Sequence, residues 1–170
     1  MADPLRIARI LVPVDGSEFS RHATEHAIRI AQAYAAEVIF IHAVDQQIVT
    51  ELTTHEPSDG TQIRGRLWEN GRIYLRDSAR LADEYNLAHR EEIAEGDPCT
   101  VICDTAVRVG ADLIVMGKIG RRGARRILLG SVTRRVAEAS DRPVLIVTAP
   151  PNELRTDELA TQPEEPTHHR

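Results

Sequence analysis

Residues 112–131 read Asp-Leu-Ile-Val-Met-Gly-Lys-Ile-Gly-Arg-Arg-Gly-Ala-Arg-Arg-Ile-Leu-Leu-Gly-Ser, and this stretch decides the fold. Its first part, residues 112–117, is a short aliphatic run of the kind that forms a buried strand. Its second part is a glycine-rich loop that ends at Gly130 and Ser131, where a helix is predicted to start and to run to Ala139. A buried strand, a glycine-rich loop and a helix in this order are typical of an α/β protein.

Outward from this stretch, the chain alternates strand and helix patterns. Aliphatic runs predict strands at residues 9–14, 38–44, 89–94, 112–117 and 143–148. Apolar residues at helical spacing predict helices between them, over residues 17–36, 67–85, 98–109 and 131–139. This alternation predicts a single doubly wound α/β domain with a five-stranded parallel sheet of order 3-2-1-4-5 and helices on both faces.

Two segments fall outside the alternation. Residues 45–60 are polar, contain turn-forming residues and show no periodicity, so we expect a long loop there. Residues 150–170 are acidic and rich in proline, with hardly any apolar side chains. We therefore expect one domain over residues 1–149, followed by a solvated and flexible tail.

The glycine-rich loop has the chemistry of an anion site. Glycine lets backbone N–H groups approach a ligand, and a helix start at Gly130 and Ser131 leaves free N–H groups where a phosphate can bind. Lys118 is the only lysine of the chain, and its ammonium group is expected to reach such phosphates. Six arginines lie between positions 121 and 135 without an intervening Asp or Glu. The pattern fits a solvated arginine face equally well, and glycine spacing alone does not separate the two interpretations.

The position of the loop in the sheet favours the ligand site. In an open parallel sheet, ligands bind at the carboxyl ends of strands where the strand order reverses. Asp15 ends the first predicted strand and Gly117 ends the fourth, so both residues are expected to face one crevice. Asp15 would then accept hydrogen bonds from a ribose or from a polar base edge, although a turn or a helix cap would also use this residue.

Several ordered motifs give the chain a resemblance to a known family. They are Ile10-Leu-Val-Pro-Val-Asp15-Gly-Ser17, Ile41-His-Ala-Val44, Glu95-Gly-Asp97, the strand at residues 112–117 and the Gly-x2-Gly-x9-Gly-Ser pattern that ends at Ser131. Over residues 7–148 the sequence resembles a universal stress protein, of the subgroup in which the full glycine pattern marks ATP binding. The resemblance implies a nucleotide-binding domain of that type over residues 1–149.

The resemblance also implies which residues contact ATP. Pro13, Val14 and Asp15 would border the adenosine, and Ala43 would offer backbone contacts to adenine. The residues around the ribose and phosphates would be Met116, Gly117, Gly120, Gly130, Ser131 and Val132. Mg²⁺ is expected to accompany ATP, without metal ligands from protein side chains. The chain departs from the family at Lys118-Ile119, where a small polar residue and a histidine are usual, and at Arg142, where a small residue or Cys is common. The first departure bears on the phosphate contacts.

Composition and charge narrow the function further. The formal net charge of -5 argues against a general nucleic-acid binder, which needs a basic surface. No apolar run is long enough for a membrane span and the first residues lack the order of a signal peptide, so we expect a cytoplasmic protein without membrane insertion.

Cys99 and Cys103 are expected to be reduced, packed thiols. His42 is expected to be a packed strand histidine rather than a catalytic group.

The leading hypothesis is an ATP-binding regulatory or stress-response protein, not an enzyme, in which ATP changes the shape or the partner preference of a homodimer. The expected dimer interface is the edge strand Val144–Val147, and an unidentified protein partner would fit this role. One alternative is a slow ATP hydrolase or adenylyl-transfer enzyme, although the sequence has no Walker motif and no evident carboxylate pair for a metal. Another is a partner-binding module with a vestigial nucleotide site, against which the intact glycine pattern argues.

Overall fold

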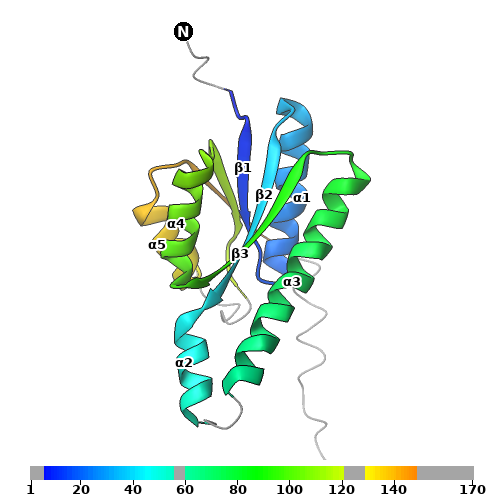
Figure 1. The fold of residues 1–170 in the computed structure, drawn as a ribbon. Helices are drawn as coiled ribbons and strands as arrows, with labels where there is room; N and C mark the ends of the chain where they lie inside the picture. Colours follow the sequence, from blue (N-terminus) through cyan, green and yellow to red (C-terminus); the bar gives the residue numbers. More distant parts are fainter. Residues whose placement is uncertain (1–5, 56–59, 121–128, 149–170) are drawn as a thin grey trace, which may run out of the picture.

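A parallel sheet lies between two layers of helices in the computed structural model, which describes residues 6–55, 60–120 and 129–148 (Figure 1). The strands pair in the order β3-β2-β1-β4-β5, and all the pairs are parallel. This confirms the predicted doubly wound α/β sheet of order 3-2-1-4-5. The elements in chain order are β1 (Arg9–Pro13), α1 (Glu18–Tyr34), β2 (Glu37–Asp45), α2 (Gln46–His55), α3 (Gly60–Glu84), β3 (His89–Gly96), α4 (Pro98–Val109), β4 (Leu113–Gly117), α5 (Ser131–Ala139) and β5 (Val144–Val147).

Both faces of the sheet are covered because successive strand residues point to opposite sides. In β1, Ile10 and Val12 are buried against α1 and α3, whereas Leu11 between them is buried against α4 and α5. The continuous aliphatic runs supply apolar side chains to both faces. The core therefore consists of two apolar layers, one on each side of the sheet.

Helix caps fix where several of the elements begin and end. Ser17 caps α1 by accepting a hydrogen bond from the backbone N–H of Ser20, and Asp97 caps α4 in the same way. Gly110, with a φ of 64°, ends α4 in the left-handed conformation that glycine adopts without strain. These caps set the start of α1 and both ends of α4.

The segment from residue 45 to residue 60 is not the long loop that we expected. Residues Gln46–His55 form α2, and α3 begins at Gly60 instead of near residue 67. Asp45 Oδ1 accepts a hydrogen bond from a backbone N–H in the first turn of α2. The hydroxyl groups of Thr50 and Thr54 donate to carbonyl groups one turn earlier, at 2.8 Å and 2.7 Å. Because these bonds stay within the helix, residues typical of turns are compatible with it.

This unexpected helix extends the molecule beyond the sheet. Figure 1 shows α2 and the first half of α3 side by side, past the carboxyl ends of the strands. The predicted tail at residues 150–170 lies outside the described residues. Within the part of the chain that the structure describes, no helix is both long enough and apolar enough to cross a membrane.

Candidate functional site

A cavity of about 760 Å³ opens at the carboxyl ends of β1, β2 and β4. Its volume falls in the range of roughly 300–1,000 Å³ that is typical of small-molecule sites. It lies where the strand order changes direction at β1, as the sequence predicts. All the predicted contact residues except Lys118 line it, namely Pro13, Val14, Asp15, Ala43, Met116, Gly117, Gly120, Gly130, Ser131 and Val132.

The turn after β1 holds the Asp15 side chain in place. Asp15 Oδ1 accepts a hydrogen bond from the backbone N–H of Ser17 at 3.0 Å. Gly16 has a φ of +75°, and a side chain on it would collide with the Tyr74 ring of α3. The turn therefore needs glycine both for its backbone conformation and for the close approach of α3. Asp15 therefore has the turn role that the sequence suggested as one possibility, and it also faces the cavity.

Backbone contacts close the two ends of the glycine-rich loop. Lys118 N–H donates to Val147 O at 2.8 Å, and Lys118 O accepts from Gly130 N–H at 2.9 Å. A β-carbon on Gly117 would lie 2.7 Å from the carbonyl carbon of Phe19, so β4 ends directly against the backbone of α1. Lys118 thus contributes its backbone to the loop, and it is not a lining residue. Residues 121–128, with four of the arginines of this pattern, lie outside the described residues.

The start of α5 forms one wall of the cavity. Its cap residue is Gly130, and within the described residues no side chain caps it by a hydrogen bond. Thr133 Oγ1 donates to Gly117 O at 2.9 Å, which fixes this helix to the end of β4. The first N–H groups of a helix have no partner inside it, and they carry the positive end of the helix dipole. This wall therefore favours a negatively charged group.

The described arginines of α5 are occupied elsewhere. Arg135 donates to both oxygens of Asp97, at 2.8 Å and 2.9 Å, and Arg134 pairs with Glu138 at 3.6 Å. The hydrogen bond from Arg135, followed by that from the Thr100 N–H, lowers the pKa of Asp97 from 3.8 to about 2. Neither arginine lines the cavity. For these two residues, the interpretation as a solvated arginine face holds, and both are paired with carboxylates.

Further residues that line the cavity were not predicted from the sequence. They come from α2, α3 and α4, and include Ile48, Leu67, Asn70, Tyr74, Pro98 and Ile102. The sequence held two signals for this lining. Apolar residues at positions 48, 49 and 52 have helical spacing, and the glycine at position 71 lets α3 approach β2. The contribution of α2 could not be predicted because residues 45–60 were expected to form a loop, whereas Leu67, Asn70 and Tyr74 lie within the predicted helix over residues 67–85.

His42 is a packed strand histidine, as predicted, and it also lines the cavity. Its Nδ1 lies 2.7 Å from Val14 O, and its ring meets that of Tyr74 edge to face at 5.5 Å between centroids. A β-carbon on Gly71 would collide with the imidazole, so glycine makes room for the ring under α3. These contacts hold the imidazole in one orientation.

The cysteines lie behind the cavity in α4. Cys99 is buried, Cys103 is partly buried, and both are free thiols. Burial, and then the neighbouring Cys99, raise the pKa of Cys103 to about 11, so its thiol stays protonated at neutral pH. Among the described residues, no group of three or more His, Cys, Asp or Glu side chains could hold a metal ion.

Comparison with known proteins matches this geometry to one family. The model of the universal stress protein family matches residues 6–148. The chain belongs to the universal stress protein family. A relative from Methanocaldococcus jannaschii, universal stress protein MJ0531, is 40% identical over 147 residues, which cover 85% of this chain and 84% of the relative.

Solved structures agree with this membership. The structure of MJ0577, also from Methanocaldococcus jannaschii, superimposes with a TM-score of 0.75 at 27% identity, over 86% of this universal stress protein and 99% of that chain. A universal stress protein in complex with cAMP superimposes with a TM-score of 0.61 at 28% identity, over 84% of this chain and 98% of its own. The family that the sequence motifs resemble is confirmed.

Proposed function

We propose that this universal stress protein is an ATP-binding regulatory protein, in which bound ATP changes the shape or the partner preference of a homodimer. One observation carries the proposal: a single cavity contains both an uncapped helix start and the Asp15 carboxylate. The helix start favours an anion, and the carboxylate favours hydroxyl or amine donors. A nucleotide offers both, with its phosphates and its ribose.

Each part of the nucleotide has a suitable wall. Backbone N–H groups of Ser131 and Val132 would hold phosphates, and Asp15 would accept hydrogen bonds from the ribose hydroxyls. The adenine would lie toward β2, where Ala43 offers its backbone and Met116 supplies an apolar surface. The loop fits such a ligand, because a β-carbon on Gly120 would crowd the Asp15 carboxylate. The similar structure in complex with cAMP supports an adenine nucleotide as the ligand class.

Mg²⁺ would accompany the triphosphate. This ion keeps several water ligands in proteins and is commonly held through substrate phosphates and one or two carboxylates. The described residues offer no cluster of three or more candidate ligands, so the phosphates would contribute most of the coordination. The ion would offset the charge that ATP brings beside Asp15.

Binding, rather than turnover, is the proposed role. Phosphoryl transfer needs a group that orients or deprotonates the attacking nucleophile. The sequence has no Walker motif, and the described residues offer no group of three or more side chains that could hold a catalytic metal ion. We therefore expect hydrolysis far below about 1 per second, the low end for ordinary enzymes.

The homodimer would form through β5. This strand lies at the edge of the sheet, and Leu145 on it keeps 37% of its surface exposed. An exposed aliphatic edge strand pairs readily with a second chain, which removes both the apolar surface and the unpaired backbone groups from water. Because Val147 in the same strand bonds to Lys118, a change in the glycine-rich loop could reach this interface.

The experiment that tests the proposal begins with gentle purification of the full-length protein. Mass spectrometry of the released small molecules should detect an adenine nucleotide, because a preformed site retains a cellular ligand. Incubation with ATP and Mg²⁺ should then give turnover far below about 1 per second. Faster magnesium-dependent turnover that is lost in Asp15→Ala would favour the enzyme alternative.

A further inference from the structure

The carboxylate of Glu95, at the end of β3, binds two side chains of α3. Glu95 Oε2 accepts a hydrogen bond from Arg64 Nε at 2.8 Å and from Trp68 Nε1 at 3.0 Å. Glu95 does not line the cavity. It pairs in register with Val44 of β2, which does, so it stands one strand away from the site. The Glu95 side chain is 19% exposed, which strengthens a charge-assisted bond relative to one in open water.

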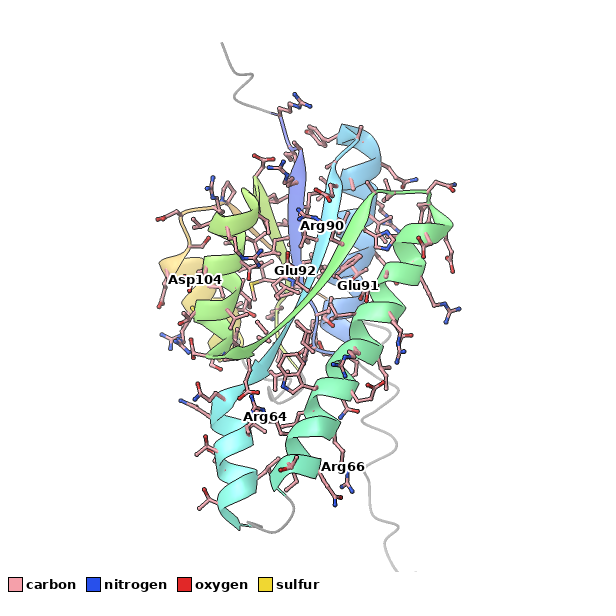
Figure 2. All side chains as sticks on the ribbon, viewed as in Figure 1. Arg64, Arg66, Arg90, Glu91, Glu92 and Asp104 are labelled. Carbon is pink, nitrogen blue, oxygen red and sulfur yellow. The ribbon has the colours of Figure 1, made fainter. Side chains whose placement is uncertain are left out.

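The part of α3 that these bonds hold contains no fully buried residue. The buried residues of α3 are Gly71, Leu75, Ala79 and Ala82, so none of them precedes Gly71. Helix stability in proteins comes mostly from packing a buried apolar face, and in residues 60–70 the apolar side chains Ile63, Leu67 and Trp68 are only partly buried. Among the described residues, the bonds to Glu95 are the side-chain hydrogen bonds that join residues 60–70 to the sheet. Figure 2 shows Arg64 between α2 and α3, at the carboxyl end of the sheet.

The same stretch of α3 carries one wall of the cavity. Leu67, which precedes Trp68, and Asn70 both line it, and Ile48 of the adjoining α2 lines it beside them. A movement of residues 60–70 away from β3 would withdraw Leu67 and Asn70 from the cavity. The position of this wall therefore depends on the contact between Glu95 and α3.

We propose that Glu95 is a positioning residue for nucleotide binding: its carboxylate fixes the first half of α3, and with it the Leu67 and Asn70 wall, over the cavity. The inference rests on the proposed binding of ATP and extends it, because it assigns retention of the ligand to a residue that does not touch it. Loss of the contact would let the wall open more often and release the nucleotide faster. The dissociation rate would rise more than the association rate would fall.

The test compares two variants of the full-length protein. Glu95→Gln keeps the size of the side chain but removes the negative charge, so the two hydrogen bonds that Oε2 accepts lose their charge assistance. Glu92→Gln is the matched control, because Glu92 lies on the same strand with a similar exposure, 22%, and pairs instead with Arg108 of α4. Figure 2 places Glu92 on the middle of β3, away from Arg64.

Three measurements separate positioning from a general structural role. Calorimetry and stopped-flow displacement give the Kd and the dissociation rate for ATP, and denaturant unfolding gives the global stability. Hydrogen exchange of residues 60–70 in the ligand-free protein reports the wall itself. Trp68 is the only tryptophan, so its emission reports the loss of its own hydrogen bond.

We expect Glu95→Gln to raise the Kd for ATP about 5-fold or more, through faster dissociation. It should also speed exchange in residues 60–70 and shift Trp68 emission to the red, while Glu92→Gln stays within about twofold of the wild type. Trp68→Phe, which removes one donor but keeps an aromatic ring, should weaken ATP binding in the same direction. Unchanged exchange and emission in Glu95→Gln, or equal weakening in both glutamate variants, would overturn the inference.

The outcomes also keep the two proposals apart. If the wild type does not bind ATP, the proposed function fails. Exchange and emission in the ligand-free variants then still decide whether Glu95 holds the wall. If the wild type binds ATP and Glu95→Gln binds it equally well, the proposed function stands and the role of Glu95 is wrong.

Discussion

Asp15 and Gly120 lie against each other in the cavity, such that a β-carbon added to Gly120 would stand 2.6 Å from Asp15 Oδ2. The two residues come from the loops that follow β1 and β4, so their contact fixes how those loops meet. Asp15 is held from its other oxygen by the N–H of Ser17, and the carboxylate has little freedom to move aside. Gly120 is not among the described glycines with positive φ. Glycine is therefore needed at position 120 for the close approach of Asp15 and not for its backbone conformation.

Gly120→Ala should therefore weaken ATP binding. Overpacking of this kind costs about 1–3 kcal/mol, which corresponds to an affinity about 5-fold to 150-fold lower if the strain is relieved by displacing Asp15. Calorimetric titration of ATP measures the effect. Gly65→Ala is the control, since nothing lies within 4 Å of its added carbon. This control should not weaken ATP binding, and it should gain up to about 1 kcal/mol in stability, because Gly65 lies within a helix. Equal affinity in Gly120→Ala would mean that the Asp15 contact is irrelevant to binding.

Gly130→Val should abolish detectable ATP binding while the fold survives. A β-carbon at this position would lie 3.3 Å from both Ile119 Cα and Lys118 O, and the two methyl groups of valine would add bulk beside the α5 start. The backbone of Gly130, with φ of -64° and ψ of 150°, suits valine, so the effect is expected at the site rather than on the chain conformation. Circular dichroism checks the fold and calorimetry the affinity. Wild-type affinity in a folded Gly130→Val protein would remove the α5 start from the phosphate site.

The strand order and most of one cavity wall could be predicted from the sequence, because both depend on short stretches of neighbouring residues. Buried parallel strands are continuous aliphatic runs, and glycines and caps such as Asp97 and Gly110 mark where elements end. The carboxyl-end rule then places Asp15 and Gly117 together. Those residues are close in space because of the topology, which a pattern of alternating elements specifies.

The other wall could not be predicted, because it depends on weakly buried helices. The α2 residues are polar apart from a few apolar positions, and their threonines satisfy themselves inside the helix. Arg135 pairs with Asp97, which lies far from it in the sequence, so this contact could not be predicted. The absence of Lys118 from the cavity lining likewise depends on how distant segments pack. Charge runs in a sequence do not show which charges are already neutralised.

The Asp97 and Arg135 pair should give the protein a distinct acid dependence. The pKa of Asp97 is about 2 in the folded chain and about 3.8 when unperturbed, so the unfolded state takes up its proton first as pH falls. The stabilisation is complete above about pH 4 and is lost as pH falls toward 2. Asp97→Asn retains the cap of α4 but loses the charge, so its unfolding free energy should fall less over this window. With the side chain 32% exposed, we expect a difference of at most about 1 kcal/mol, measured by urea unfolding at several pH values. Parallel pH profiles would contradict the assignment.

Leu145→Asp should shift the proposed homodimer toward monomer. A carboxylate on the edge of β5 would be desolvated in a strand-to-strand interface, whereas it stays hydrated in the free chain. Analytical ultracentrifugation measures the association. Val107→Asp provides the control, because Val107 on α4 is 56% exposed and lies away from this edge. A wild-type protein that sediments as a monomer, or equal loss of dimer in both variants, would exclude β5 as the interface.

Calorimetric titration of ATP with Mg²⁺ into the nucleotide-free, full-length protein decides whether the cavity binds ATP. We expect saturable binding at one site per chain, weakened in Gly120→Ala and retained in Gly65→Ala. A folded wild-type protein that shows no saturable binding of ATP at millimolar concentration would contradict it.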